Sequence, residues 1–104
     1  MDKMVALLED LPWEAGPYPG SRIKIYPFIE GTPFFCGVLD LETGAVLEEH
    51  EENFNELTFV IKGDATIEGK ECPEGSYFYT PAGKKHGPFT TREGCRFLIV
   101  KFSP

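Results

Sequence analysis

The feature that most constrains the fold is the alternation of short apolar segments with turn residues from Ser21 onward. The segments are rich in β-branched and aromatic residues, and Gly, Pro or Asn clusters such as Gly31-Thr32-Pro33 separate them. Many short strands at regular spacing are typical of a β-sandwich or barrel. We expect strands over residues 22–29, 34–41, 45–51, 57–62, 65–68, 77–80, 87–91 and 96–102.

The beginning of the chain has a different pattern. Its apolar residues recur at helical spacing and are Met4, Leu7, Leu8 and Leu11. They predict a short amphipathic helix over residues 3–11, which Pro12 ends. An irregular arm follows, and we expect Trp13 to pack it against the rest of the molecule. The predicted organisation is an N-terminal helix and arm over residues 1–20 and one barrel domain over residues 21–104.

Composition narrows the classes of function. A chain of 104 residues is long enough for one domain with its own core. The net charge of -7 argues against a nucleic acid or an anionic membrane as partner, because both would repel it. No apolar run approaches the roughly 20 residues that span a bilayer. The chain starts without a basic leader, so a cytoplasmic location is expected.

The cysteines give no disulfide framework. They are odd in number, widely spaced and without a CxxC pattern: Cys36, Cys72 and Cys95. We interpret them as reduced thiols, with a cysteine at or near a metal as the alternative.

The two histidines of the chain, His50 and His86, both lie in spaced frames of glycine, proline and carboxylate residues. The first frame covers residues 44–63 and the second covers residues 75–86. Imidazole and carboxylate groups are the usual ligands of a divalent cation that keeps an open position for chemistry. The frames therefore predict a metal site.

Strand periodicity indicates how the ligands converge. His50 and Glu52 are two residues apart, so in a strand both point to the same face. The segment Asn53-Phe54-Asn55 predicts a tight turn, which would make the strand from Glu56 the antiparallel neighbour of the first. Glu56 would then lie across from His50 and Glu52. His86 would arrive from a third strand or from its leading loop.

With these residues in place, the chain resembles the cupin superfamily, small double-stranded β-helix or jelly-roll barrels. The residues at the spacings of the two cupin motifs are Gly44, His50, Glu56, Gly63, Gly75, Pro81, Gly83 and His86. The resemblance implies an all-β fold and a metal site. Two positions depart from the commonest pattern: Glu52 replaces the second histidine, and Thr90 replaces an asparagine. The second change affects a turn, whereas the first alters the chemistry.

Two ligand sets are open. If His50, Glu52, Glu56 and His86 all bind, two carboxylates cancel the charge of a dication, which weakens the attraction for anionic substrates. If Glu52 stays off the metal, the other three form a two-histidine, one-carboxylate face, and Glu52 becomes a catalytic base or an outer hydrogen-bond acceptor. This second pattern is similar to that of 3-hydroxyanthranilate dioxygenase-type cupins. Either set suits Fe, Mn, Ni or Zn.

The resemblance implies a metal-dependent dioxygenase that acts on a small organic substrate. The alternatives are a metal-dependent isomerase, epimerase or lyase acting on a sugar or small acid, and a non-catalytic binding or sensor module. Lys85 next to His86 is the candidate for holding a substrate carboxylate. We also expect a homodimer, because pairing barrel edges would protect them.

Overall fold

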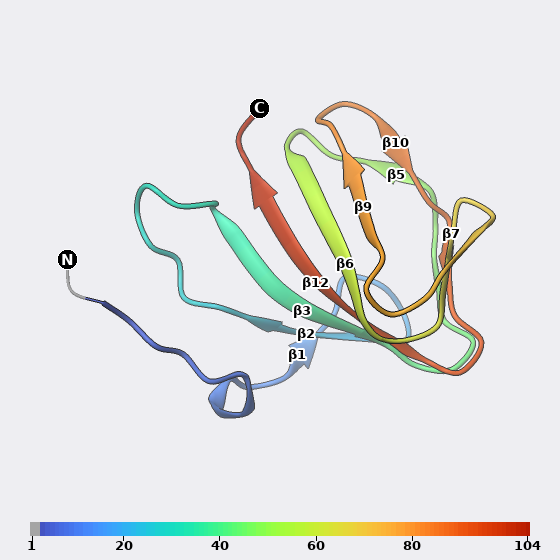
Figure 1. Cartoon of the computed structure of the whole chain (residues 1–104), viewed down its shortest axis with the longest axis horizontal. Helices are drawn as coiled ribbons and strands as arrows, with labels where there is room; N and C mark the ends of the chain where they lie inside the picture. Colours follow the sequence, from blue (N-terminus) through green and yellow to red (C-terminus); the bar gives the residue numbers. More distant parts are fainter. Residues whose placement is uncertain (1–2) are drawn as a thin grey trace.

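The computed structural model describes residues 3–104 and shows two facing walls of antiparallel strands (Figure 1). One wall is a six-stranded sheet, whose strands in spatial order are β1 (Glu14–Ala15), β2 (Ser21–Ile25), β3 (Phe35–Leu41), β12 (Cys95–Phe102), β6 (Asn55–Gly63) and β9 (Tyr77–Thr80). The neighbours in this sheet are mostly distant in sequence. This is the arrangement of a jelly roll, and the all-β prediction is confirmed.

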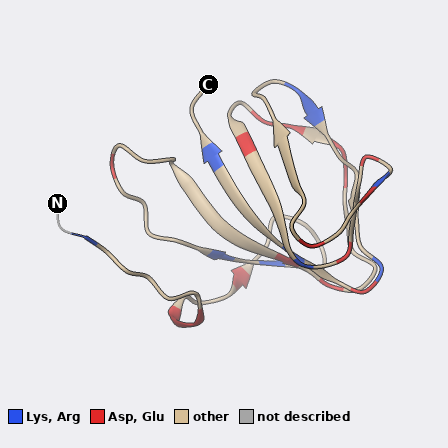
Figure 2. Ribbon diagram, viewed as in Figure 1, with Lys and Arg blue, Asp and Glu red and all other residues tan. Residues whose placement is uncertain are grey.

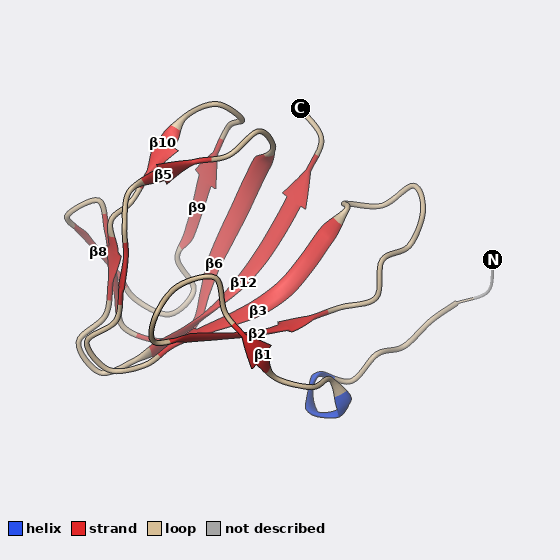
Figure 3. Ribbon diagram, turned by 180° about the vertical axis from the view of Figure 1, so that it is seen from behind, coloured by secondary structure: helices blue, strands red, loops and turns tan. Residues whose placement is uncertain are grey.

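The opposite wall consists of two smaller sheets, seen from behind in Figure 3. The four-stranded sheet contains β4 (Val46–Leu47), β11 (Phe89–Thr90), β7 (Ala65–Ile67) and β8 (Lys70–Cys72). The two-stranded sheet pairs β10 (Lys85–His86) with β5 (His50–Glu51). Both histidines are therefore on the smaller wall and face the six-stranded sheet.

Alternate side chains of the strands fill the space between the walls. On β6, the buried residues are Glu56, Thr58 and Val60, two positions apart. On β12, the buried residues are Cys95, Phe97 and Ile99. Because a strand places alternate residues on one face, these two strands send their side chains into one core. Phe97 lies at its centre and is fully buried.

The two strands that the sequence predicted as hairpin neighbours do not pair. β5 pairs with β10, whereas β6 pairs with β12 and β9. Residues 52–54 contain no turn that returns the chain to the same sheet, and instead carry it from one wall to the other. The prediction of a hairpin here was wrong, because a short polar connection looks the same in a hairpin and in a crossover. The strands β1 and β8 were also missed, and each is only two or three residues long.

The N-terminal helix predicted over residues 3–11 is reduced to one 3-10 turn, Leu8–Asp10. Met4 and Leu7 are about half exposed, so this segment has no face to bury a helical stripe. The arm is held instead by polar contacts with β2. The Lys24 ammonium group donates a hydrogen bond to the Leu8 carbonyl oxygen (2.9 Å), and the Arg22 guanidinium lies 3.9 Å from the centre of the Trp13 ring. Within residues 3–104, no helix is long and apolar enough to cross a membrane.

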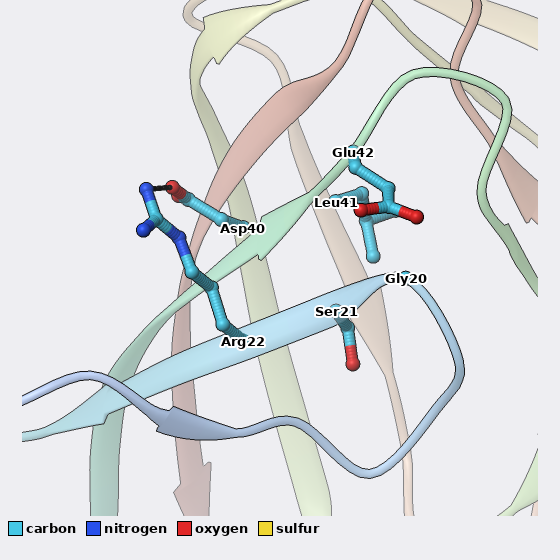
Figure 4. A pocket seen from close by; sticks show the side chains of 6 residues that line it. All are labelled: Gly20, Ser21, Arg22, Asp40, Leu41 and Glu42. Carbon is cyan, nitrogen blue, oxygen red and sulfur yellow. Dashed lines mark hydrogen bonds and ion pairs between the residues drawn. The ribbon is translucent and has the colours of Figure 1, made fainter.

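A polar hollow lies outside the barrel, between β2 and the end of β3 (Figure 4). Arg22 bonds to Asp40 across it at 3.1 Å, and Arg96 also binds Asp40, at 2.6 Å. Burial alone would raise the pKa of Asp40, but the hydrogen bonds from the two arginines outweigh it and hold this pKa below its usual range. The hollow is open, and its Arg22 and Asp40 charges are paired with each other. It stabilises the sheet and brings together no catalytic set.

Three glycines of the two motif frames lie in turns, and Gly63 is the last residue of β6. Gly44, Gly63, Gly75 and Gly83 all have positive φ, which L side chains rarely adopt. Gly63 has a second constraint, because a Cβ there would collide with the backbone of Gly94. The β6–β12 pairing also shifts register next to this point, between Arg96 and Phe97.

We predict that Gly63→Ala destabilises the protein more than Gly75→Ala. Gly75 has the same positive φ but open space around its Cα, so it serves as the matched control. The control change should cost about 1–2 kcal/mol for the left-handed backbone. The Gly63 change should cost roughly 1–3 kcal/mol more, because the backbone of β12 must move. Urea unfolding measures both, and equal losses would contradict this account of Gly63.

Candidate metal centre

The two histidines lie directly opposite each other in the β5–β10 pair. Their Nε2 atoms are 2.9 Å apart, and their ring centres are 4.4 Å apart. Residues directly opposite in an antiparallel pair project from the same face of the sheet. The short ladder between β5 and β10 therefore turns both imidazoles toward the barrel interior.

Hydrogen bonds orient both rings. His50 Nδ1 lies 2.8 Å from the carbonyl oxygen of Glu48, which only accepts, so this nitrogen carries the proton and the His50 Nε2 lone pair faces the cluster. His86 Nδ1 lies 2.8 Å from the Thr80 hydroxyl. If both Nε2 atoms bound a cation, the proton of the His86 ring would be on Nδ1, which would donate a hydrogen bond to the Thr80 hydroxyl. Such outer hydrogen bonds fix the tautomer of metal-binding histidines.

His86 is suited to remain neutral. Its side chain is only 2% exposed. Burial lowers the pKa of His86, because it disfavours the charged imidazolium. A neutral imidazole keeps the lone pair that a metal requires.

Glu52 supplies the third candidate metal-binding group. Its Oε2 atom is buried without a hydrogen-bond partner and lies 3.7 Å from His86 Nε2. An unpaired buried carboxylate oxygen is costly. One ligand atom from each of His50, Glu52 and His86 lies within 4.8 Å of the others. Metal–ligand bonds of about 2.0–2.2 Å can join atoms at such separations with small adjustments.

Glu56 lies beside this group, near the other nitrogen of His86. Its Oε2 atom accepts a hydrogen bond from Thr58 (3.0 Å) and lies 3.9 Å from His86 Nδ1. Burial raises the pKa of Glu56 to about 8, and the neighbouring Glu52 carboxylate contributes to this shift. Burial would also raise the pKa of Glu52, but its contacts with Glu56 and Lys101 lower it. We therefore take Glu52 as the ionised member of the pair.

The geometry thus brings together the four residues expected from sequence, but not equally. Glu52 shares the Nε2 side of the imidazoles, whereas Glu56 is near Nδ1 of His86. The set in which Glu56 binds and Glu52 stays off the metal has less support from these contacts. A divalent transition metal fits the donor atoms of His50, Glu52 and His86.

Sequence reasoning missed Lys101. Its ammonium group donates to Glu52 Oε1 at 3.2 Å and lies 4.0 Å from Glu56 Oε1. The end of β12 and the start of β6, which carry these charges, are adjacent in Figure 2. The period of two over residues 95–102 places Lys101 on the same face as Phe97 and Ile99, but its position beside Glu56 depends on the pairing of β12 with β6, which the sequence did not predict.

Lys85 does not lie in the cavity. It is exposed on β10, where it lies opposite Glu51 in the strand register, while the adjacent His86 is buried. Neighbouring residues of a strand face opposite sides, so these positions cannot both face the interior. The arrangement gives no support to substrate binding by Lys85.

A cavity of about 110 Å³ adjoins the centre. Glu52, Glu56, His50 and Lys101 line its polar side. The rest of the wall is mainly apolar: Pro17, Tyr18, Ile23, Phe35, Leu39, Leu47, Phe89, Phe97 and Ile99. Tyr18 comes from the N-terminal arm, and its ring centre is 5.5 Å from that of His50. Burial and the charges of Glu52 and Glu56 raise the pKa of Tyr18. The cavity can take a small molecule next to His50 and Glu52.

Comparison with known proteins agrees with this picture. A family model described as the ChrR cupin-like domain matches residues 1–104. The chain belongs to this cupin family. No curated protein matches it. The cupin fold that the sequence motifs implied is thus confirmed.

Solved structures share the fold. KdgF from Halomonas sp. matches with a TM-score of 0.80 and 21% identity, over 99% of this chain and 94% of that one. An acetylacetone dioxygenase from Acinetobacter johnsonii matches with a TM-score of 0.76 and 14% identity, over 98% and 74%. A chain in the complex of Rhodobacter sphaeroides SigE with the anti-sigma ChrR matches with a TM-score of 0.75 and 25% identity. That match covers 91% of this cupin and 51% of the other chain.

We predict that Glu52→Gln weakens metal binding more than Glu56→Gln. The first change removes the charge of the carboxylate that shares the Nε2 side of the imidazoles. The second leaves the three grouped donor atoms in place. We expect at least a tenfold loss of Zn²⁺ affinity for the first and less than threefold for the second, measured by competition with a chromogenic chelator. The reverse order would assign the ligand role to Glu56.

Proposed function

We propose that this cupin is a non-haem, metal-dependent dioxygenase that acts on a small organic substrate. The observation that carries the proposal is the grouping of His50, Glu52 and His86, of which His50 and Glu52 line a mainly apolar cavity. Two imidazoles and one carboxylate leave open positions on a metal, which is the ligand set of non-haem Fe(II) oxygenases. The fold shared with an acetylacetone dioxygenase is compatible with this chemistry.

The residues around the centre would have separate roles in metal binding, proton transfer and the exclusion of water. His50, Glu52 and His86 would hold the metal, which supplies the redox chemistry when it is ferrous iron. Glu56 lines the cavity beside these donor atoms, where its carboxyl group could hold or release a proton for a bound substrate. This assignment moves the acid–base role expected for Glu52 to its neighbour. The apolar wall would exclude bulk water from the reacting groups.

The cavity limits the substrate. A volume of about 110 Å³ equals the space of about four water molecules. Small diketones, short-chain thiols and short-chain acids therefore suit the site better than fused ring systems do. Aromatic substrates of the kind handled by 3-hydroxyanthranilate dioxygenase-type cupins would require the Tyr18 arm to move.

A non-catalytic sensor module is the second candidate. The observation in its favour is the family model itself, together with the likeness to a chain of the SigE–ChrR complex. In that case the same cavity would bind a metal or a small ligand, and the outer surface would transmit the change to a partner. An isomerase or lyase would use the same metal centre but would not consume oxygen.

Oxygen consumption separates these functions. Protein loaded anaerobically with Fe(II) should consume dioxygen in an oxygen electrode when it meets its substrate in a panel of small diketones, thiols and acids. Zn-loaded protein and Glu52→Gln are the controls, and both should be inactive. Ligand-dependent melting shifts without oxygen uptake would favour the sensor. Turnover that continues with Zn²⁺ in the absence of oxygen would favour the isomerase or lyase.

The homodimer expected from sequence stays a prediction. Exposed apolar residues gather on the outer face of the six-stranded sheet at its β9 edge. Tyr77 and Tyr79 of β9 are 67% and 45% exposed, and Ile61 of β6 is 43% exposed. We propose this surface as the place where a second copy would pack.

A further inference from the structure

We propose that the cavity binds a small organic anion, whose charged group lies between the metal and the Lys101 ammonium. This inference rests on the proposed metal centre and names the ligand class that the centre takes. It depends on three features: the balance of charge, a free donor on Lys101, and the size of the apolar wall.

The balance of charge favours an anion. A dication and Lys101 together carry three positive charges, and they exceed the two negative charges that Glu52 and Glu56 hold when both are ionised. The excess is larger when one of these carboxyl groups is protonated, so its sign does not depend on their titration. The four-ligand set expected from sequence would give a neutral site, because Lys101 was not placed in the cavity. Burying a net positive charge against apolar walls favours a ligand that neutralises it.

Lys101 has a donor to spare. An ammonium group has three N–H donors. Glu52 Oε1 at 3.2 Å and Glu56 Oε1 at 4.0 Å account for at most two. The other neighbours are the rings of Phe35 and Phe54, 4.9 and 4.6 Å away, which hold the ammonium group by cation–π attraction. Lys101 lines the cavity, and its side chain is 21% exposed. A carboxylate or enolate oxygen can therefore accept its third hydrogen bond.

The rest of the ligand must be short and apolar. Beyond the charged groups, the cavity wall includes the apolar side chains of Phe35, Leu39 and Ile99. These side chains offer no polar partner, so a second charge or a chain of hydroxyl groups would lose its hydration without compensation. The volume of about 110 Å³ matches a ligand of the size of acetate or propionate. Short-chain monocarboxylates and enolates of small ketones meet both conditions.

A purely structural role for Lys101, as the counter-ion of Glu52, makes a different prediction. If Lys101 only positioned Glu52, its removal would weaken metal binding and anion binding together. If Lys101 recognises the anion, its removal takes a positive charge away from the cation and leaves metal affinity equal or higher. Anion affinity then falls alone.

The test uses Co²⁺-loaded protein titrated with propionate and with neutral, equally sized propionamide. Isothermal calorimetry and the visible absorption of Co²⁺ report binding without any need for turnover. The variant is Lys101→Met, and the matched control is Lys85→Met, which removes an exposed lysine on the outer face. Metal affinity is measured separately for each protein by chelator competition.

We expect wild-type protein and Lys85→Met to bind propionate at least tenfold more tightly than propionamide. Lys101→Met should lose at least tenfold in propionate affinity while its Co²⁺ affinity is unchanged or higher. Equal binding of the amide, an unaffected Lys101→Met, or parallel loss of both affinities would overturn the inference. If Co²⁺ binds and propionate does not, the inference fails alone. If Co²⁺ does not bind at all, the proposed function fails with it.

Discussion

The pairing of β5 with β10 is the constraint on which the site depends. It joins two segments that are 36 residues apart and places His50 directly opposite His86. Each strand is only two residues long, so this ladder contributes few backbone hydrogen bonds of its own. Its position is fixed by what surrounds it: the Gly83 turn bonds back to the Glu52 carbonyl oxygen (2.8 Å), and Thr80 holds the His86 ring. The scaffold thus orients both imidazoles before any ion arrives.

The same site holds several charged groups, which are costly to bury in an apolar barrel interior. Two carboxylates, an ammonium group and the His50 imidazole share a space whose remaining walls are mainly apolar, and His86 lies directly beside it. Lys101 offsets part of the cost of burying Glu52, and Thr58 donates to Glu56. The unpaired Glu52 Oε2 is the part of this cost that the protein does not offset by itself. A cation next to the two Nε2 atoms would satisfy it, and this links the energetics of the fold to the proposed function.

Much of the centre could be predicted from sequence, because its main signals are local. The spacing of the glycines and histidines gave the fold, and the period of two put Glu52 on the same face as His50. What failed needed long-range knowledge. Nothing within residues 50–56 distinguishes a hairpin from a crossover, so the strand that pairs with β5 was misassigned. Lys101 is far in sequence from the other site residues, and only the register of β12 beside β6 brings it to Glu56. In residues 3–11, a helical spacing of apolar residues was misleading because Met4 and Leu7 stay about half exposed.

The most direct test of the central claim is an anomalous diffraction measurement at the zinc edge on crystals of the Zn-loaded protein. The account predicts one strong peak about 2.0–2.2 Å from His50 Nε2, His86 Nε2 and a Glu52 carboxylate oxygen. A peak elsewhere in the molecule would contradict it. So would a well-ordered site in which the two imidazoles point apart and no ion lies between them.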